Sequence, residues 1–291
     1  MGPLQVVLDA KVTLGEGPSW EPGSNRLYWV DILGRQLHIY DPATGSDDTV
    51  DVGQLIGAVV PRQSGGVVMA LQNGFHTYDF ETKQLTPIGD PEADKAHTRF
   101  NDGKCDAAGR FWAGTMSLND SPKQGALYCL ETDGSIRKVI DGVTCSNGIA
   151  WNPDNTVMYY IDSPTRQVVA HDYDLATGGI SNPRVVVQLA DEDGVPDGMT
   201  SDSEGMLWVA VWGGWRVSRY NPETGEQLAR IDVPAEKVTS CVFTGDKLNE
   251  LYITSARTGI DEEGLAKQPL AGGLFRVKTD IQGSPTYAYG G

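Results

Sequence analysis

Short runs of β-branched and aromatic residues, each introduced by a turn, recur along the whole chain. They lie at 25–31, 65–71, 109–114, 156–162, 205–210 and 249–254. Their central residues are spaced 40 to 48 positions apart; these markers are Trp29, Met69, Trp112, Tyr160, Trp208 and Tyr252. A run of this composition after turn residues is typical of a β-strand. Recurrence at this period indicates a repeat architecture such as a propeller.

Further strands follow each marker run in most copies. A second strand, closed by a turn, lies at 37–45, 75–80, 126–130, 168–173 and 217–225, and outer strands lie at 48–52, 136–140, 184–188 and 227–233. Four strands in about 45 residues is the content of one propeller blade. The pattern therefore predicts an all-β, six-bladed β-propeller of four-stranded blades around a central channel, as a single domain over residues 1–291. A β-sandwich is the alternative, although sandwiches do not repeat at a fixed period.

The first strand-like segment, residues 4–8, has no blade of its own. We expect it to complete the last blade and close the ring, because closure removes an exposed sheet edge.

Composition narrows the classes of partner. The chain carries a net charge of −16 and 35 glycines. Such an acidic surface disfavours nucleic acid and anionic membranes as partners, and the glycines suit many tight turns. The four cysteines form no Cys-x-x-Cys pair, no apolar run reaches the ~20 residues of a membrane helix, and the N-terminus does not resemble a signal peptide. We expect reduced thiols and a cytoplasmic protein.

Polar residues recur at one phase of the repeat, 11 to 13 positions before a marker residue. They are Glu16, Asn101, Asn147, Asp197 and Ser240; only the second copy breaks the pattern, with residues 55–58 in that slot. A propeller brings the loops that enter its innermost strands to the central axis, so these side chains are predicted to meet there.

Two carboxylates at one axis would repel each other, and one would be driven to bind a proton. A divalent cation removes that conflict, because carboxylate and amide oxygens are the ligands that hard cations prefer. We therefore predict one bound divalent metal ion. The oxygen ligands admit Ca²⁺, Mg²⁺ or Mn²⁺, and Zn²⁺ stays open. The alternative is that these residues serve only as separate turn and cap residues.

Six motifs resemble the SMP-30/gluconolactonase/regucalcin family over nearly the whole chain. They lie at 14–20, 99–106, 113–116, 146–151, 196–199 and 268–275. The resemblance implies a six-bladed propeller that hydrolyses sugar-acid lactones with a bound divalent metal. It implies Glu16, Asn147 and Asp197 as metal ligands, Asn101 near metal and substrate, and Arg99 as a contact to substrate hydroxyls.

One segment departs from the family pattern. Regucalcin-like members carry an acidic pair after the Gly-Thr-Met element, whereas this chain reads Ser117-Leu-Asn-Asp120. Asn119 is the residue predicted to replace the acid that binds sugar hydroxyls. The Trp-Gly-Gly-Trp stretch at 212–215 is interpreted either as the rim of a pocket or as a turn with an exposed aromatic residue.

The function predicted from these patterns is metal-assisted hydrolysis of a small sugar lactone, with Asp197 accepting a proton from the attacking water. The expected assembly is a monomer or a weak homo-oligomer. Three other functions stay open: a related propeller hydrolase for organophosphates or other esters, a calcium-binding regulatory protein without turnover, and a protein-interaction platform.

Overall fold

The computed structural model describes residues 1–291, and antiparallel sheets of consecutive strands make up most of it. Four of these sheets have four strands each. They are β2 (Gly15–Glu21), β3 (Arg26–Asp31), β4 (Gln36–Asp41) and β5 (Ser46–Asp51); β6 (Ile56–Pro61), β7 (Val67–Leu71), β8 (Gly74–Tyr78) and β9 (Leu85–Gly89); β10 (Thr98–Cys105), β11 (Phe111–Ser117), β12 (Gly125–Leu130) and β13 (Ile136–Val143); and β14 (Ser146–Trp151), β15 (Val157–Asp162), β16 (Gln167–Asp174) and β17 (Gly179–Gln188).

The other eight strands form one continuous sheet. It contains β18 (Val195–Ser201), β19 (Leu207–Trp212), β20 (Arg216–Tyr220), β21 (Gln227–Asp232), β22 (Lys237–Thr244), β23 (Glu250–Ala256), β24 (Leu274–Lys278) and β1 (Gln5–Leu8). One residue pair, Trp212 with Lys237, joins β19 to β22. β1 pairs antiparallel with β24, which confirms the prediction that residues 4–8 complete the last group of strands.

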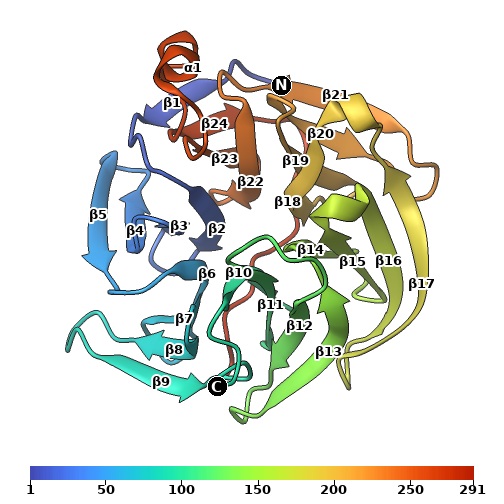
Figure 1. Ribbon diagram of the computed structural model, residues 1–291. Helices are drawn as coiled ribbons and strands as arrows, with labels where there is room; N and C mark the ends of the chain where they lie inside the picture. The colour runs from blue at the N-terminus through green and yellow to red at the C-terminus, as the bar shows by residue number, and fades with distance from the viewer.

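The innermost strands surround a central channel (Figure 1). β2, β6, β10, β14, β18 and β22 each contact the next in this order, and β22 contacts β2. This closed succession of antiparallel sheets agrees with the predicted all-β propeller architecture.

Turn chemistry sets the strand connections. Between β4 and β5, the Asp41 carboxylate accepts the Ala43 N–H at 2.8 Å, and the Asp41 carbonyl accepts the Gly45 N–H at 2.8 Å. Gly45 has a φ of 74°, which a residue with a Cβ rarely adopts. The Asp-Pro-x-Thr-Gly sequence therefore forms the turn that its composition predicts.

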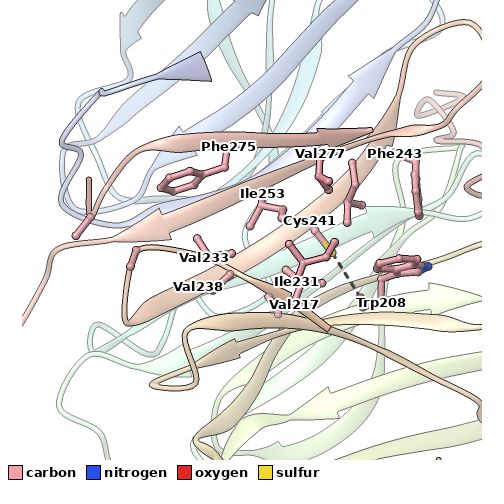
Figure 2. Close-up of a cluster of buried hydrophobic side chains, with 14 residues drawn as sticks. Trp208, Val217, Ile231, Val233, Val238, Cys241, Phe243, Ile253, Phe275 and Val277 are labelled. Atoms are coloured by element: carbon pink, nitrogen blue, oxygen red, sulfur yellow. Dashed lines mark hydrogen bonds between the residues drawn. The ribbon is translucent and has the colours of Figure 1, made fainter. Parts of the chain in front are cut away.

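Apolar side chains fill the space between neighbouring groups of strands. Figure 2 shows one such cluster, to which Trp208 of β19, Cys241 of β22 and Phe275 of β24 contribute side chains. All three side chains are buried, and the Cys241 thiol donates to the Trp208 carbonyl at 3.5 Å. Burial of such apolar surface stabilises a fold by roughly 25 cal/mol per Å², so these interfaces hold the strands around the channel.

Helical segments are few. α1 (Glu262–Lys267) lies outside the ring of sheets (Figure 1), and two 3₁₀ turns are η1 (Ser163–Thr165) and η2 (Asp191–Asp193). Asp261 caps α1 by accepting the Gly264 N–H at 2.8 Å. No helix combines the length and the apolar character that crossing a membrane would require.

The C-terminal segment, residues 279–291, crosses the far end of the channel. In Figure 1 it passes behind the central opening toward the C-terminus. Its backbone N–H groups at Ser284, Tyr289 and Gly290 donate to the carbonyls of Ser201, Pro61 and Gly109 at 2.8 to 3.0 Å. We call this segment the C-terminal strap. It ties together sheets that are distant in sequence.

Candidate metal and substrate site

The polar residues of the repeat lie within the innermost strands. This corrects the prediction that they lie in loops, because the marker residues belong to the second strand of each sheet. Every innermost strand has a register shift at the same level, where it carries one more residue than its partner. The shifts lie between Glu16 and Ser19, Ile56 and Ala58, Phe100 and Gly103, Asn147 and Ile149, Pro196 and Met199, and Val238 and Ser240.

A β-bulge bends its strand and redirects a side chain. Asn101 and Asp197 lie between the paired residues of their shifts, whereas Glu16 and Asn147 stand at the first residue. The ring of bulges explains how strand residues of different sheets reach one cavity.

Glycines at the bulges let neighbouring innermost strands approach each other closely. A Cβ at Gly148 would lie 2.7 Å from the Asp197 carbonyl oxygen, and one at Gly198 would lie 2.8 Å from the Thr239 carbonyl oxygen. Both distances are too short for a real side chain, so any other residue would force the strands apart.

One cavity of about 450 Å³ opens at this level of the channel. Five of the six predicted site residues line it, and each is at most 7% exposed: Glu16, Arg99, Asn101, Asn147 and Asp197. Leu14, Met116, Val195 and Trp212 contribute apolar wall. A cavity of this size with a few convergent polar groups is typical of a small-molecule site.

A directed chain of hydrogen bonds fixes the polar side chains. Arg99 Nη1 donates to Asn101 Oδ1 at 2.8 Å, and Asn101 Nδ2 donates to Asn147 Oδ1 at 3.1 Å. Asn147 Nδ2 donates in turn to Ser163 Oγ at 2.8 Å, and Ser163 Oγ donates to the Pro196 carbonyl at 2.6 Å. Because each amide has a donor on one side and an acceptor on the other, the network assigns the orientation of both carboxamides.

The carboxyl groups of Glu16 and Asp197 are buried without a cationic partner. Burial, with Asp102 adding repulsion, raises the pKa of Glu16 to about 8, although the Gly17 N–H opposes the shift. Burial and the charge of Glu16 raise the pKa of Asp197 well above its usual range. No Lys, Arg or His nitrogen lies within 4.0 Å of either carboxylate.

This donor set fits a hard divalent cation. It offers the carboxylates of Glu16 and Asp197, both beside the oxygen-lined cavity, and the oriented amide oxygen of Asn147. No group of three or more His, Cys, Asp or Glu side chains is placed to hold a metal, and the donor set at this cavity combines two acids with one amide. Carboxylate and amide oxygens are the ligands that Ca²⁺, Mg²⁺ and Mn²⁺ prefer.

Arg99 supplies a positive charge to the cavity wall. Its side-chain hydrogen bonds both leave from Nη1, toward the Phe100 carbonyl at 2.9 Å and toward Asn101. No carboxylate lies within 4.0 Å of its guanidinium, and burial lowers the pKa of Arg99. The remaining N–H groups can therefore contact a ligand in the cavity.

Asn119 does not reach the cavity. It is exposed and contacts the Ser117 hydroxyl, whereas the next residue, Asp120, lines the cavity. Trp212 lines the cavity as well, and Trp215 is 39% exposed, so the Trp-Gly-Gly-Trp stretch serves both as pocket rim and as exposed turn.

Sequence reasoning missed Ser163 and Asp102. Ser163 follows β15 outside every repeat motif, and nothing in the sequence marks it. Asp102 stands beside Asn101 in the motif at 99–106 and is 7% exposed; its unusual burial shows only in the folded chain.

Comparisons with known proteins agree with this arrangement. The SMP-30/Gluconolactonase/LRE-like region matches residues 14–257. Regucalcin of Danio rerio is 44% identical over 99% of this chain and 98% of its own length. YvrE of Bacillus subtilis (strain 168), named as a putative sugar lactone lactonase, is 41% identical over 97% of both chains.

Solved structures give the same picture. A calcium-binding protein, regucalcin, from Agrobacterium tumefaciens superposes with a TM-score of 0.95 and 28% identity, covering 99% of this chain and 97% of its own. A luciferin-regenerating enzyme gives a TM-score of 0.94 at 31% identity with full coverage of both chains. With the motifs, the bulge ring and these matches together, the chain belongs to the SMP-30/gluconolactonase/LRE-like family.

Proposed function

We propose that this protein hydrolyses sugar-acid lactones with one divalent metal ion bound by Glu16, Asn147 and Asp197. One observation carries the proposal: two buried, mutually repelling carboxylates and an oriented amide oxygen lie in one cavity with the unpaired cation of Arg99. The relatives named regucalcin and sugar lactone lactonase support the same chemistry.

The architecture that we propose is one domain of six blades over residues 1–291. The eight-stranded sheet is counted as two blades, because a single residue pair joins its halves. The closed contacts among the innermost strands support that count.

Asp197 is the proposed proton acceptor for the attacking water. The water oxygen adds to the lactone carbonyl carbon while one of its protons passes to Asp197. The ring C–O bond then breaks, and the ring oxygen takes up that proton and leaves as a hydroxyl group of the product acid. A bound metal ion supplies Lewis-acid polarisation of the carbonyl. Arg99 and Asn101 hold the ring hydroxyls, and Asn101 is itself positioned by its donation to the Ser146 carbonyl at 2.8 Å.

Asp120 is the acid best placed to contact substrate hydroxyls at the rim, since it lines the cavity. We propose Asn119 as a second contact to the substrate hydroxyls. Its side chain now accepts a hydrogen bond from the Ser117 hydroxyl and would have to move into the cavity when substrate binds.

We propose a monomer or weak homo-oligomer in the cytoplasm, with a small-molecule sugar lactone as its partner. The exposed large apolar residues are scattered over separate elements, at Met1, Val6, Leu33, Leu118, Val185, Trp215 and Leu228. All four cysteines are free thiols.

A lactonase assay tests the proposal. Chelator-treated protein is titrated with Ca²⁺, Mg²⁺, Mn²⁺ or Zn²⁺ and offered a panel of aldonolactones and aryl phosphates in a pH-stat. We expect metal-dependent turnover of aldonolactones and its loss in Asp197→Ala. Calcium binding without turnover of any lactone would instead identify a regulatory protein, and preferential cleavage of aryl phosphates would identify an organophosphate hydrolase.

A further inference from the structure

Two charged side chains of β10, two positions apart in the sequence, lie behind the cavity. Asp102 is 7% exposed and does not line the metal-site cavity. Lys104 lines a second cavity, of about 220 Å³, together with the C-terminal strap residues Gln282 and Ser284. Asp102 and Lys104 therefore lie between the candidate metal site and the strap.

Lys104 reaches across the channel. Its Nζ donates to the carbonyl of Met199 on β18 at 2.6 Å. β10 and β18 are not neighbours in the ring, because β14 stands between them and contacts both. Met199 lies two residues beyond Asp197 on the same strand, so the ammonium group is bonded to the strand that carries the proposed ligand.

Asp102 lacks the partners of a structural carboxylate. The one hydrogen bond to its side chain comes from the Gly103 N–H, at 2.7 Å. By contrast, Asp106, four residues further along the chain, accepts five hydrogen bonds, two from backbone N–H groups and three from side chains. Asp102 stands instead in the β10 bulge between Phe100 and Gly103, next to Asn101, whose side chain lines the metal-site cavity.

The two charges have opposite signs. Asp102 adds a negative charge to those of Glu16 and Asp197, and Lys104 adds a positive charge to that of Arg99 on the cavity wall. Removing the Lys104 charge would therefore make the surroundings of a bound cation more negative, and removing the Asp102 charge would make them less negative.

We propose that Asp102 and Lys104 are positioning residues that set the metal affinity of the site from behind, Asp102 raising it and Lys104 lowering it, without contacting the ion. The inference rests on the proposed function, because it requires a metal at Glu16, Asn147 and Asp197. The partly desolvated channel gives such charges an effect that a surface charge would not have.

Calorimetric titration of the chelator-treated full chain with Ca²⁺ and Mn²⁺ tests the proposal without any activity readout. We expect the Kd to fall roughly tenfold in Lys104→Met and to rise roughly tenfold in Asp102→Asn, as a charge acting at short range through protein requires. In the double variant the two shifts should largely cancel. Lys247→Met removes an exposed lysine from the turn between β22 and β23 and should leave the Kd unchanged.

The opposite signs of the two effects identify an electrostatic role. General damage to the fold would weaken binding in both variants, and that result, or no change in either, overturns the proposal. If Lys104→Met does not fold, Lys104→Gln keeps a donor for the Met199 carbonyl without the charge and should show the same tightening. If the wild-type chain binds neither ion, the proposed function itself fails, and this inference falls with it.

Discussion

β18 leads to two buried aspartates that have opposite surroundings. Asp202, immediately after the strand, is fully buried, and four N–H groups donate to it at 2.8 to 3.0 Å, from Glu204, Met206, Trp208 and Arg219. Asp197, inside the strand, is 5% exposed and has no cation within 4.0 Å. Both residues are buried aspartates, so neither the residue type nor the burial tells a structural carboxylate from a functional one. The difference is whether the surrounding chain satisfies the charge.

The same contrast recurs on β10. Asp106 closes a turn and accepts hydrogen bonds from the indole of Trp112 and the hydroxyl of Tyr173, whereas Asp102 has a single backbone donor. Asp106 and Trp112 repeat the spacing of Asp202 and Trp208. At β10 and β18 alike, the aspartate that follows the strand is hydrogen-bonded to groups of its own sheet. A polar residue inside the strand, Asn101 or Asp197, lines the cavity and can contact a ligand.

The largest expected effect separates activity from stability. Asp197→Asn should lower kcat/KM for an aldonolactone by about 10³-fold, because it removes a ligand charge and the proton acceptor. The metal-free variant should unfold in urea at the wild-type midpoint or above it, since a repelling buried charge is gone. A lower midpoint of the metal-free variant would show that Asp197 is a structural carboxylate after all.

The matched change at the other end of β18 should do the reverse. Asp202→Asn presents an amide N–H to the donors of Trp208 and Arg219, and it weakens the pairing of a buried guanidinium. We expect a loss of about 3 kcal/mol in the free energy of unfolding, measured by urea denaturation. The metal Kd measured at a temperature where the variant is folded should stay at the wild-type value, and a changed Kd would break the distinction between the two ends.

The smallest expected effect tests a single hydroxyl group, which also accepts a hydrogen bond from Arg110 Nη1 at 3.3 Å. Tyr173→Phe removes the hydroxyl that donates to Asp106 at 2.6 Å and should cost about 1.5 kcal/mol of stability, as for a hydrogen bond to a charged group. Tyr159→Phe is the control, because Tyr159 is similarly buried but its hydroxyl makes no hydrogen bond to protein, so its loss should change stability by less than about 0.5 kcal/mol. Equal effects of both changes would mean that the Asp106 network contributes little.

The period of the marker residues was enough to predict the sheets, because strand and turn composition is local. The convergence of Glu16, Asn101, Asn147 and Asp197 on one cavity followed from their common phase. Their place inside strands did not follow, because a bulge depends on the register of the partner strand.

The missed residues share one physical reason. Asp102 matters through the charges that surround it, and Ser163 matters through one hydrogen bond to the Asn147 amide. Asn119 and Asp120 are adjacent, and the conformation of an exposed loop decides which of them faces the cavity. Such contacts depend on tertiary structure, which a single sequence does not display.

The C-terminal strap makes the two ends of the channel different. The innermost strands begin at the candidate site and end at the strap, where Arg62 Nε donates to the Gly291 carbonyl at 2.8 Å. A fluorophore, affinity handle or surface linker joined after Gly291 would therefore leave the mouth of the cavity free. Tethered protein could then be titrated with metal and lactone without the attachment obstructing entry.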